Sequence, residues 1–177
     1  MLITLVGLPG SGKSTVGRHL ARRLKYSFSD SDAVIEDQLG CAIKEYFERE
    51  GESRFRDHEE SVIDALTQTP LGILATGGGA VLREVTRRRL RERSYVVYLH
   101  SLPDELLKRV RHDANRPLLQ VPDPLGRLRE LHAARDPFYR ETAHLVIETG
   151  RPSVSTLVNT ILVQLAPYGL ERAGSNN

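Results

Sequence analysis

The glycine-rich segment that begins at Gly7 has the residue types and spacing of a phosphate-binding loop. Its letters are GLPGSGKS, which fit the pattern G-x-x-x-x-G-K-[ST] from Gly7 to Ser14. Glycines at these positions let backbone N–H groups converge on phosphate oxygens. A helix that starts near Lys13 would direct the positive end of its dipole at the same anion. The segment therefore predicts a site for the phosphates of a nucleotide, in preference to a plain glycine turn before a helix.

The polar residues of this loop predict how a nucleoside triphosphate would be bound. We expect Lys13 to hold the β and γ phosphates and the Ser14 hydroxyl to bind Mg²⁺. The base-reading motif N-K-x-D of GTPases is absent from the sequence, so an ATP-dependent small-molecule kinase is the leading class. The loop residues expected to bind ATP are Gly10, Ser11, Gly12, Lys13, Ser14 and Thr15.

Two carboxylates, Asp30 and Asp32, follow the second predicted strand. In a parallel sheet this position lies at the carboxyl edge, where ligands of doubly wound folds bind. One aspartate would accept a hydrogen bond from an attacking hydroxyl, while the other would hold a water molecule on the metal. Taken alone, the pair could equally cap the helix that begins near Ala33, and both interpretations stay open.

The elements that must position these residues follow from the apolar pattern. Apolar runs at residues 2–6, 71–75, 95–99 and 145–147 alternate with helical patterns, which predicts an α/β domain with a mainly parallel sheet. From Lys13, apolar residues recur every four positions and predict an amphipathic helix.

Two segments interrupt the alternation of strands and helices. Residues of about 43–67 form a helical insert, and the polar segment of about 111–123, with two prolines, is expected to be a mobile lid. We expect one domain over residues 1–167, with residues 168–177 as a flexible tail.

Composition excludes several other classes of protein. The 177 residues fit one domain, and 40% hydrophobic with 27% charged residues is ordinary for a cytoplasmic globular protein. We expect no membrane partner, because no uninterrupted apolar run has the required length, and no nucleic-acid partner, because the net charge is only +2. No signal peptide is evident, and the single Cys41 fits a reducing compartment. A monomer is expected.

Several further motifs occur together and resemble the shikimate kinase family in order along nearly the whole chain. After the phosphate-binding loop they are Asp30-Ser31-Asp32 with Ile35-Glu36, Gly51 to Arg56 with Glu59, Gly77-Gly78-Gly79, Arg116-Pro117-Leu118-Leu119, and Arg135 four residues before Tyr139. The resemblance implies a single P-loop kinase domain with a five-stranded sheet. It also implies transfer of the ATP γ-phosphoryl group to the 3-hydroxyl of shikimate, in the chorismate and aromatic amino-acid pathway.

The resemblance also assigns roles around the acceptor. Asp32 would be the catalytic carboxylate, and Asp30 would hold Mg²⁺ through water. Arg56 and Arg135 would bind the substrate carboxylate, because planar guanidinium groups form paired, charge-assisted hydrogen bonds with it. Glu59, one helical turn after Arg56, would orient that arginine.

Other roles concern the substrate turn, the lid and the adenine. Substrate contact is expected at Gly77, Gly78 and Gly79, where missing side chains permit close approach. Arg116 in the lid would stabilise the transferring phosphate, and so joins Asp32 and Lys13 as a catalytic residue. At the adenine end we expect Arg111, with Arg109 as its alternative, and Arg151.

Three questions remain open from the sequence. Phe47 and Phe55 could wall the substrate or belong to the core of the insert. The strand of residues 71–75 is followed by Thr76 and lacks the acidic Walker B residue, so metal binding must rely on other groups. Another small kinase, such as a gluconate or nucleoside monophosphate kinase, and a non-catalytic nucleotide-binding module are the alternative functions.

Overall fold

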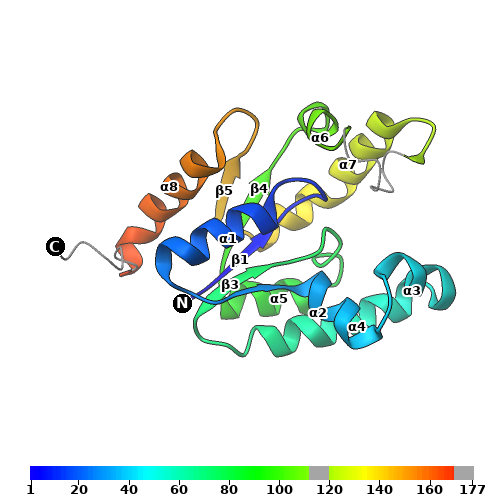
Figure 1. The fold of residues 1–177 in the computed structure, drawn as a ribbon, viewed down its shortest axis with the longest axis horizontal. Helices are drawn as coiled ribbons and strands as arrows, with labels where there is room; N and C mark the ends of the chain where they lie inside the picture. The colour runs from blue at the N-terminus through cyan, green and yellow to red at the C-terminus, as the bar shows by residue number, and fades with distance from the viewer. Residues whose placement is uncertain (112–119, 170–177) are drawn as a thin grey trace.

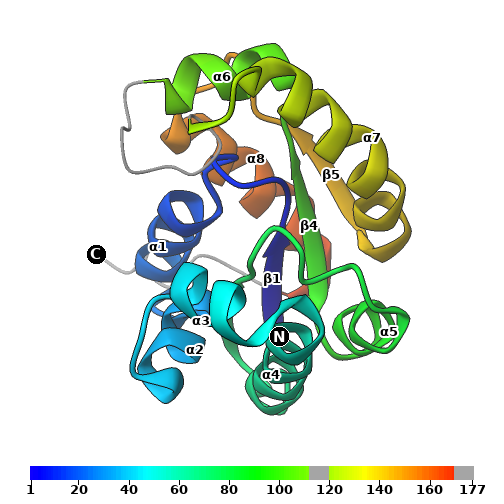
Figure 2. The ribbon, with the colours of Figure 1, turned by 90° about the vertical axis from the view of Figure 1, so that its right-hand side faces the viewer.

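The protein is a parallel sheet with helices on both faces (Figures 1 and 2). The computed structural model describes residues 1–111 and 120–169. The strands are β1 (Leu2–Val6), β2 (Phe28–Asp30), β3 (Gly72–Ala75), β4 (Tyr95–His100) and β5 (Leu145–Glu148). Their order is β2-β3-β1-β4-β5, and every pairing is parallel. The predicted α/β class and five-stranded sheet are therefore confirmed.

The helices fill the connections that parallel strands require. They are α1 (Lys13–Leu24), α2 (Ser31–Leu39), α3 (Ile43–Glu50), α4 (Glu52–Leu66), α5 (Glu84–Arg93), α6 (Pro103–Val110), α7 (Pro124–Thr142) and α8 (Val154–Leu165), followed by the 3-10 turn η2 (Ala166–Tyr168). No described helix is both long and apolar enough to cross a bilayer.

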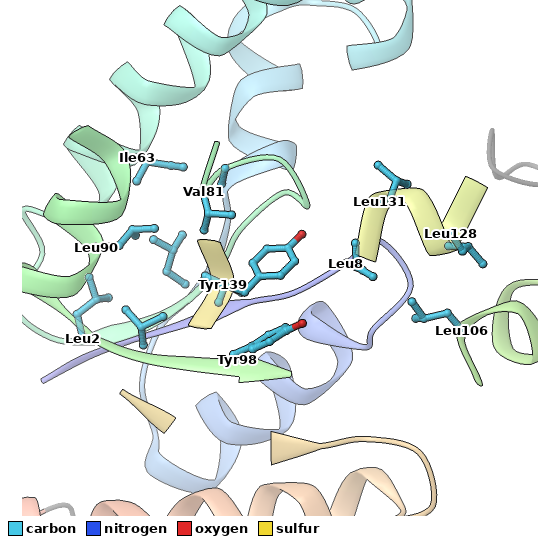
Figure 3. Close-up of a cluster of buried hydrophobic side chains, with 14 residues drawn as sticks. Leu2, Leu8, Ile63, Val81, Leu90, Tyr98, Leu106, Leu128, Leu131 and Tyr139 are labelled. Carbon is cyan, nitrogen blue, oxygen red and sulfur yellow. The ribbon is translucent and has the colours of Figure 1, made fainter. Parts of the chain in front are cut away.

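The core has two layers because side chains alternate along each strand. Ile3 and Leu5 of β1 belong to the cluster formed with α1 and α8. Leu2 and Val6 face the opposite way and join residues of α4, α5, α6 and α7. This second cluster contains the rings of Tyr98 and Tyr139, whose centroids are 4.9 Å apart and whose planes are tilted by 35° (Figure 3). Burial on both faces explains why the central strands are almost continuously apolar.

The helical insert has a small core of its own with α2. Ile35, Tyr46, Phe55 and Val62 are buried there, and Phe47 packs against them. The rings of Phe47 and Phe55 lie 5.6 Å apart, and Phe55 is 4% exposed. Of the two interpretations for these phenylalanines, the structure supports the core of the insert.

The ends of two predicted segments differ in detail from the structure. The Tyr168 ring lies 5.3 Å from the ring of Tyr95, so the first residue of the predicted tail of residues 168–177 packs on the domain. The rest of the tail, residues 170–177, lies outside the described residues, as do residues 112–119 of the predicted lid, including Arg116.

Candidate functional site

A cavity of about 500 Å³ opens at the carboxyl edge of the sheet, where β1, β2 and β3 end. The strand ends meet there because β1 pairs with β3, and β3 pairs with β2. The cavity is lined by Pro9, Gly10, Gly12, Lys13, Ser14, Thr15, Asp30, Asp32, Thr76, Gly77, Gly78, Arg109 and Val154. The structure thus brings most of the predicted phosphate and acceptor residues to one place.

The phosphate-binding loop is shaped for an anion at the start of α1. Gly12 precedes the helix with φ 95°, a left-handed conformation that favours glycine. The Lys13 ammonium donates to the carbonyl oxygens of Gly7 at 2.8 Å and Leu8 at 2.9 Å, and the residue is 8% exposed. A buried cation at a helix N-terminus makes this loop strongly attractive to phosphate.

Asp30 links the loop to the second carboxylate. The Ser14 hydroxyl donates to Asp30 Oδ2 at 2.7 Å. Asp30 Oδ1 accepts from the backbone N–H groups of Asp32 and Ala33, at 3.0 and 3.3 Å. Asp30 therefore caps α2, as one of the two interpretations held, and the same side chain still lies against the proposed metal ligand Ser14. A hydroxyl and a carboxylate oxygen side by side are ligands that suit Mg²⁺.

Asp32 sits in the first turn of α2 in an environment that opposes its charge. Burial raises its pKa to about 6, with further contributions from the negative charges of Glu59 and Asp30, while Lys13 acts in the opposite direction. Gly77 lies so close that a Cβ atom there would be 2.5 Å from Asp32 Oδ1. A carboxylate of this kind is poised to accept a proton near neutral pH.

Two arginines flank the three-glycine turn after β3. Arg56 donates to Glu59 Oε1 at 2.7 Å, and its guanidinium lies where a Cβ atom of Gly79 would collide with it. Arg135 Nη1 lies 3.2 Å from the position of a Cβ atom on Gly78. A side chain at either glycine would displace an arginine from its present position, so the bare backbone leaves room for both guanidinium groups beside the turn.

Glu59 is the buried anchor of this arrangement. It is 3% exposed, and burial raises its pKa while Arg56 and Arg135 oppose that shift. Its contact with Arg56 confirms the predicted pairing one helical turn apart. The Glu59 carboxylate in this position orients the guanidinium group of Arg56.

Tyr139 is a part of the site to which the sequence analysis gave no role. Its side chain is fully buried, and its hydroxyl donates to the carbonyl oxygen of Gly78. It lies one turn after Arg135 on α7, so both face the glycine turn. The spacing of the two residues was visible in the sequence, but the direction of α7 was not.

The adenine end differs from the sequence-based preference. Arg109 lines the cavity and donates to the Ser11 carbonyl oxygen at 3.3 Å and to the Thr149 carbonyl oxygen. Arg111 is exposed and is not among the lining residues. Residues two apart on a helix face different directions, and the placement favours Arg109. Arg151 is exposed in the turn before α8, two residues from Ser153.

The end of β3 confirms that no acidic side chain follows the strand. Thr76 is buried, and its hydroxyl donates to the Leu5 carbonyl oxygen at 2.9 Å. This hydrogen bond links the end of β3 to β1. Ser14, Asp30 and Asp32 supply side-chain oxygens at this edge that could bind a metal.

Comparisons with known proteins point to one family. The family model described as Shikimate kinase matches residues 9–166. A shikimate kinase of Paracidovorax citrulli (strain AAC00-1) is 57% identical over 171 residues, which cover 95% of this chain and 93% of the relative.

Solved structures give the same result. A shikimate kinase from Acinetobacter baumannii in complex with shikimate has a TM-score of 0.89 and 45% identity, covering 96% of this chain and 95% of that one. A gluconokinase from Sinorhizobium meliloti 1021 has a TM-score of 0.56 at 20% identity, covering 94% and 91%, which shows a shared fold alone. This chain belongs to the shikimate kinase family.

Proposed function

We infer that this protein transfers the γ-phosphoryl group of ATP to the 3-hydroxyl of shikimate, giving shikimate 3-phosphate and ADP. The observation that carries the inference is the position of Asp32, Arg56 and Arg135 around the glycine turn, beside the phosphate-binding loop. A proton acceptor and a carboxylate-binding pair would then lie next to the phosphate donor. The related A. baumannii structure holds shikimate.

The substrate carboxylate is bound between the two arginines. Arg56 and Arg135 approach the turn of Gly78 and Gly79 from different elements, α4 and α7. Charge-assisted hydrogen bonds from both would fix the ring, and with it the distance from the 3-hydroxyl to the γ-phosphate.

The chemical step needs a group to orient and deprotonate the hydroxyl. Asp32 accepts the hydroxyl proton as the O–P bond forms, and the bond between the γ-phosphorus and the β,γ-bridging oxygen breaks to release ADP. A carboxylate whose pKa is about 6 is mostly ionised at neutral pH yet basic enough to receive a proton. Lys13 stabilises charge on the phosphates, and Arg116 is proposed to add to it from the lid.

A magnesium ion fits the oxygen ligands at the start of α1. Ser14 would bind it directly and Asp30 through water, as their 2.7 Å contact suggests. When bound with ATP, the ion neutralises charge on the β and γ phosphates. We further propose that Arg109 stacks on adenine in place of Arg111, and that the protein is a cytoplasmic monomer.

A coupled assay of ADP release tests the proposed function. Mg-ATP is supplied with shikimate, with gluconate, with a panel of nucleoside monophosphates, and without an acceptor. Stimulation by shikimate alone is expected. Turnover with gluconate or a nucleotide would identify the other kinase class, and no turnover with any acceptor would identify a non-catalytic nucleotide-binding module. Either of these results would contradict the proposal.

A further inference from the structure

A second group of metal-binding side chains lies on the other side of β4 from α1, between the sheet and α7. His100 ends β4, while His132 and Asp136 lie one turn apart on the inner face of α7. Figure 2 shows α7 running alongside β4 and β5. Among the described residues 1–111 and 120–169, these three have ligand atoms close enough together to bind one ion.

The distances between the three ligand atoms match a small metal ion. His100 Nε2 is 2.9 Å from His132 Nε2 and 3.9 Å from Asp136 Oδ1, and His132 Nε2 is 3.8 Å from the same oxygen. A point equidistant from all three atoms in their plane lies about 2.1 Å from each of them. Zinc–nitrogen and zinc–oxygen bonds have about this length.

The groups around the ligands are arranged as they are in known metal sites. His100 Nδ1 lies 2.7 Å from Glu148 Oε2, because the register of the sheet pairs these two residues. A carboxylate that accepts from Nδ1 leaves Nε2 with its lone pair free to bind a metal. Asp136 is oriented by hydrogen bonds from Tyr98 at 2.7 Å and Arg140 at 3.0 Å. A carboxylate has enough lone pairs to accept both and still bind an ion.

The exposure of the cluster permits entry and leaves room for further ligands. The side chain of His100 is 8% exposed, whereas those of His132 and Asp136 are 23% and 20% exposed. An ion can therefore arrive from solvent and keep one or two waters. Two imidazoles and a carboxylate suit zinc and its neighbours in the first transition series better than Mg²⁺, which prefers oxygen alone.

We propose that His100, His132 and Asp136 bind one divalent transition-metal ion of the zinc class, which joins α7 to β4. The site is separate from the Mg²⁺ ligands proposed at Ser14 and Asp30, and it does not depend on the proposed kinase activity. Binding replaces the His100–His132 hydrogen bond with two metal–nitrogen bonds, and His132 carries its proton on Nδ1 in the bound form. The ion would tie the helix that holds Arg135 to the central part of the sheet.

The test is a titration of the untagged protein with Zn²⁺ in the presence of excess Mg²⁺, measured by calorimetry. The titration is repeated with Co²⁺ and measured by visible absorption. Wild type is expected to bind one ion, and His132→Ala to lose at least about a hundredfold in affinity. Glu148→Gln should lose about tenfold, because it alters only the partner of His100. His19→Ala, which changes a partly exposed histidine on α1, is the matched control and should bind as wild type does.

Two further readouts keep the proposal open to refutation. Saturating Zn²⁺ should raise the melting temperature of wild type by about 5 °C and leave that of His132→Ala unchanged. Bands of Co²⁺ bound to nitrogen and oxygen should appear in wild type and be absent from His132→Ala. If His132→Ala does not fold, Glu148→Gln decides. Stoichiometric binding that none of these variants weakens, or no binding by wild type, would overturn the proposal.

Discussion

Asp32, the proposed proton acceptor, lies in an environment that opposes its negative charge. Burial disfavours the negative charge of its carboxylate, the charges of Glu59 and Asp30 add to this effect, and Lys13 compensates only in part. Enzymes commonly raise the pKa of a carboxylate in this way when it must exchange a proton near neutral pH. The same environment makes the ionised residue unfavourable for folding.

The substitution Asp32→Asn should therefore lower activity and raise stability together. Loss of the proton acceptor is expected to reduce kcat by about 10²- to 10⁴-fold. The raised pKa means that the native state binds more protons than the unfolded state between about pH 4 and pH 6. Stability is thus lost as the pH rises through this window, and above it the charge costs about 3 kcal/mol.

Thermal unfolding of the two proteins at several pH values checks this prediction. Asp32→Asn should melt above wild type at pH 7.5, and the difference should disappear toward pH 4. Asp37→Asn, at an exposed position of α2, is the control and should show neither effect. A lower melting temperature of Asp32→Asn at pH 7.5 would show that the charge is not destabilising.

The pKa of Asp32 also predicts the acid limb of the activity profile. With saturating ATP, kcat/KM for shikimate should fall about tenfold per unit below pH 6, because only the ionised carboxylate accepts the hydroxyl proton. Steady-state rates from pH 5 to pH 8 give this profile. A flat profile down to pH 5 would remove Asp32 from the role of proton acceptor.

Tyr139 is predicted to position the substrate turn without touching the reacting atoms. Tyr139→Phe removes the hydrogen bond to the Gly78 carbonyl oxygen, which should cost about 1 kcal/mol of stability and raise the KM for shikimate about fivefold. The KM for ATP should stay as in wild type. Steady-state kinetics with each substrate varied in turn measure the two KM values separately. Equal changes in both would indicate a general loss of structure and contradict the positioning role.

At the scale of elements, α6 determines which arginine can reach the nucleotide. Arg109 faces the phosphate-binding loop, while Arg111 follows the last residue of α6 and is exposed. Arg109→Ala should therefore raise the KM for ATP about tenfold, by loss of a stacking cation. Arg111→Ala serves as the matched control in the same kinetic assay, with a change of less than about twofold. A larger increase in the KM for ATP in Arg111→Ala than in Arg109→Ala would instead support Arg111 as the residue that stacks on adenine.

The elements differed in how well they could be predicted from the sequence. β1, β3 and β4 are buried on both faces, so their apolar runs located them within a residue or two. β2 has three half-buried residues and no such run. The sequence predicted a strand that ends just before Asp30, whereas Asp30 is the last residue of β2. The rotation of α6 is set by packing rather than by its own sequence, which is why Arg109 and Arg111 could not be separated.

At the scale of the whole molecule, the site is assembled from segments that lie far apart in the chain. Asp32 on α2, Arg56 on α4, the glycine turn after β3, and Arg135 on α7 meet because the strand order brings their elements to one edge. Motifs identified these residues, since spacing within a motif is local. Pairings such as Tyr139 with Gly78, or His100 with His132, depend on how helices lie on the sheet, and no local pattern predicts them.

The most direct test of this account is the position of the phosphate in the product. The protein is incubated with Mg-ATP and shikimate, and the product is examined by phosphorus–proton correlation NMR. The arrangement of Asp32 and the two arginines predicts one product with the phosphate on the 3-hydroxyl, formed in equal amount to ADP. Phosphate on another hydroxyl, or ADP accompanied only by free phosphate, would contradict the proposed orientation of the substrate.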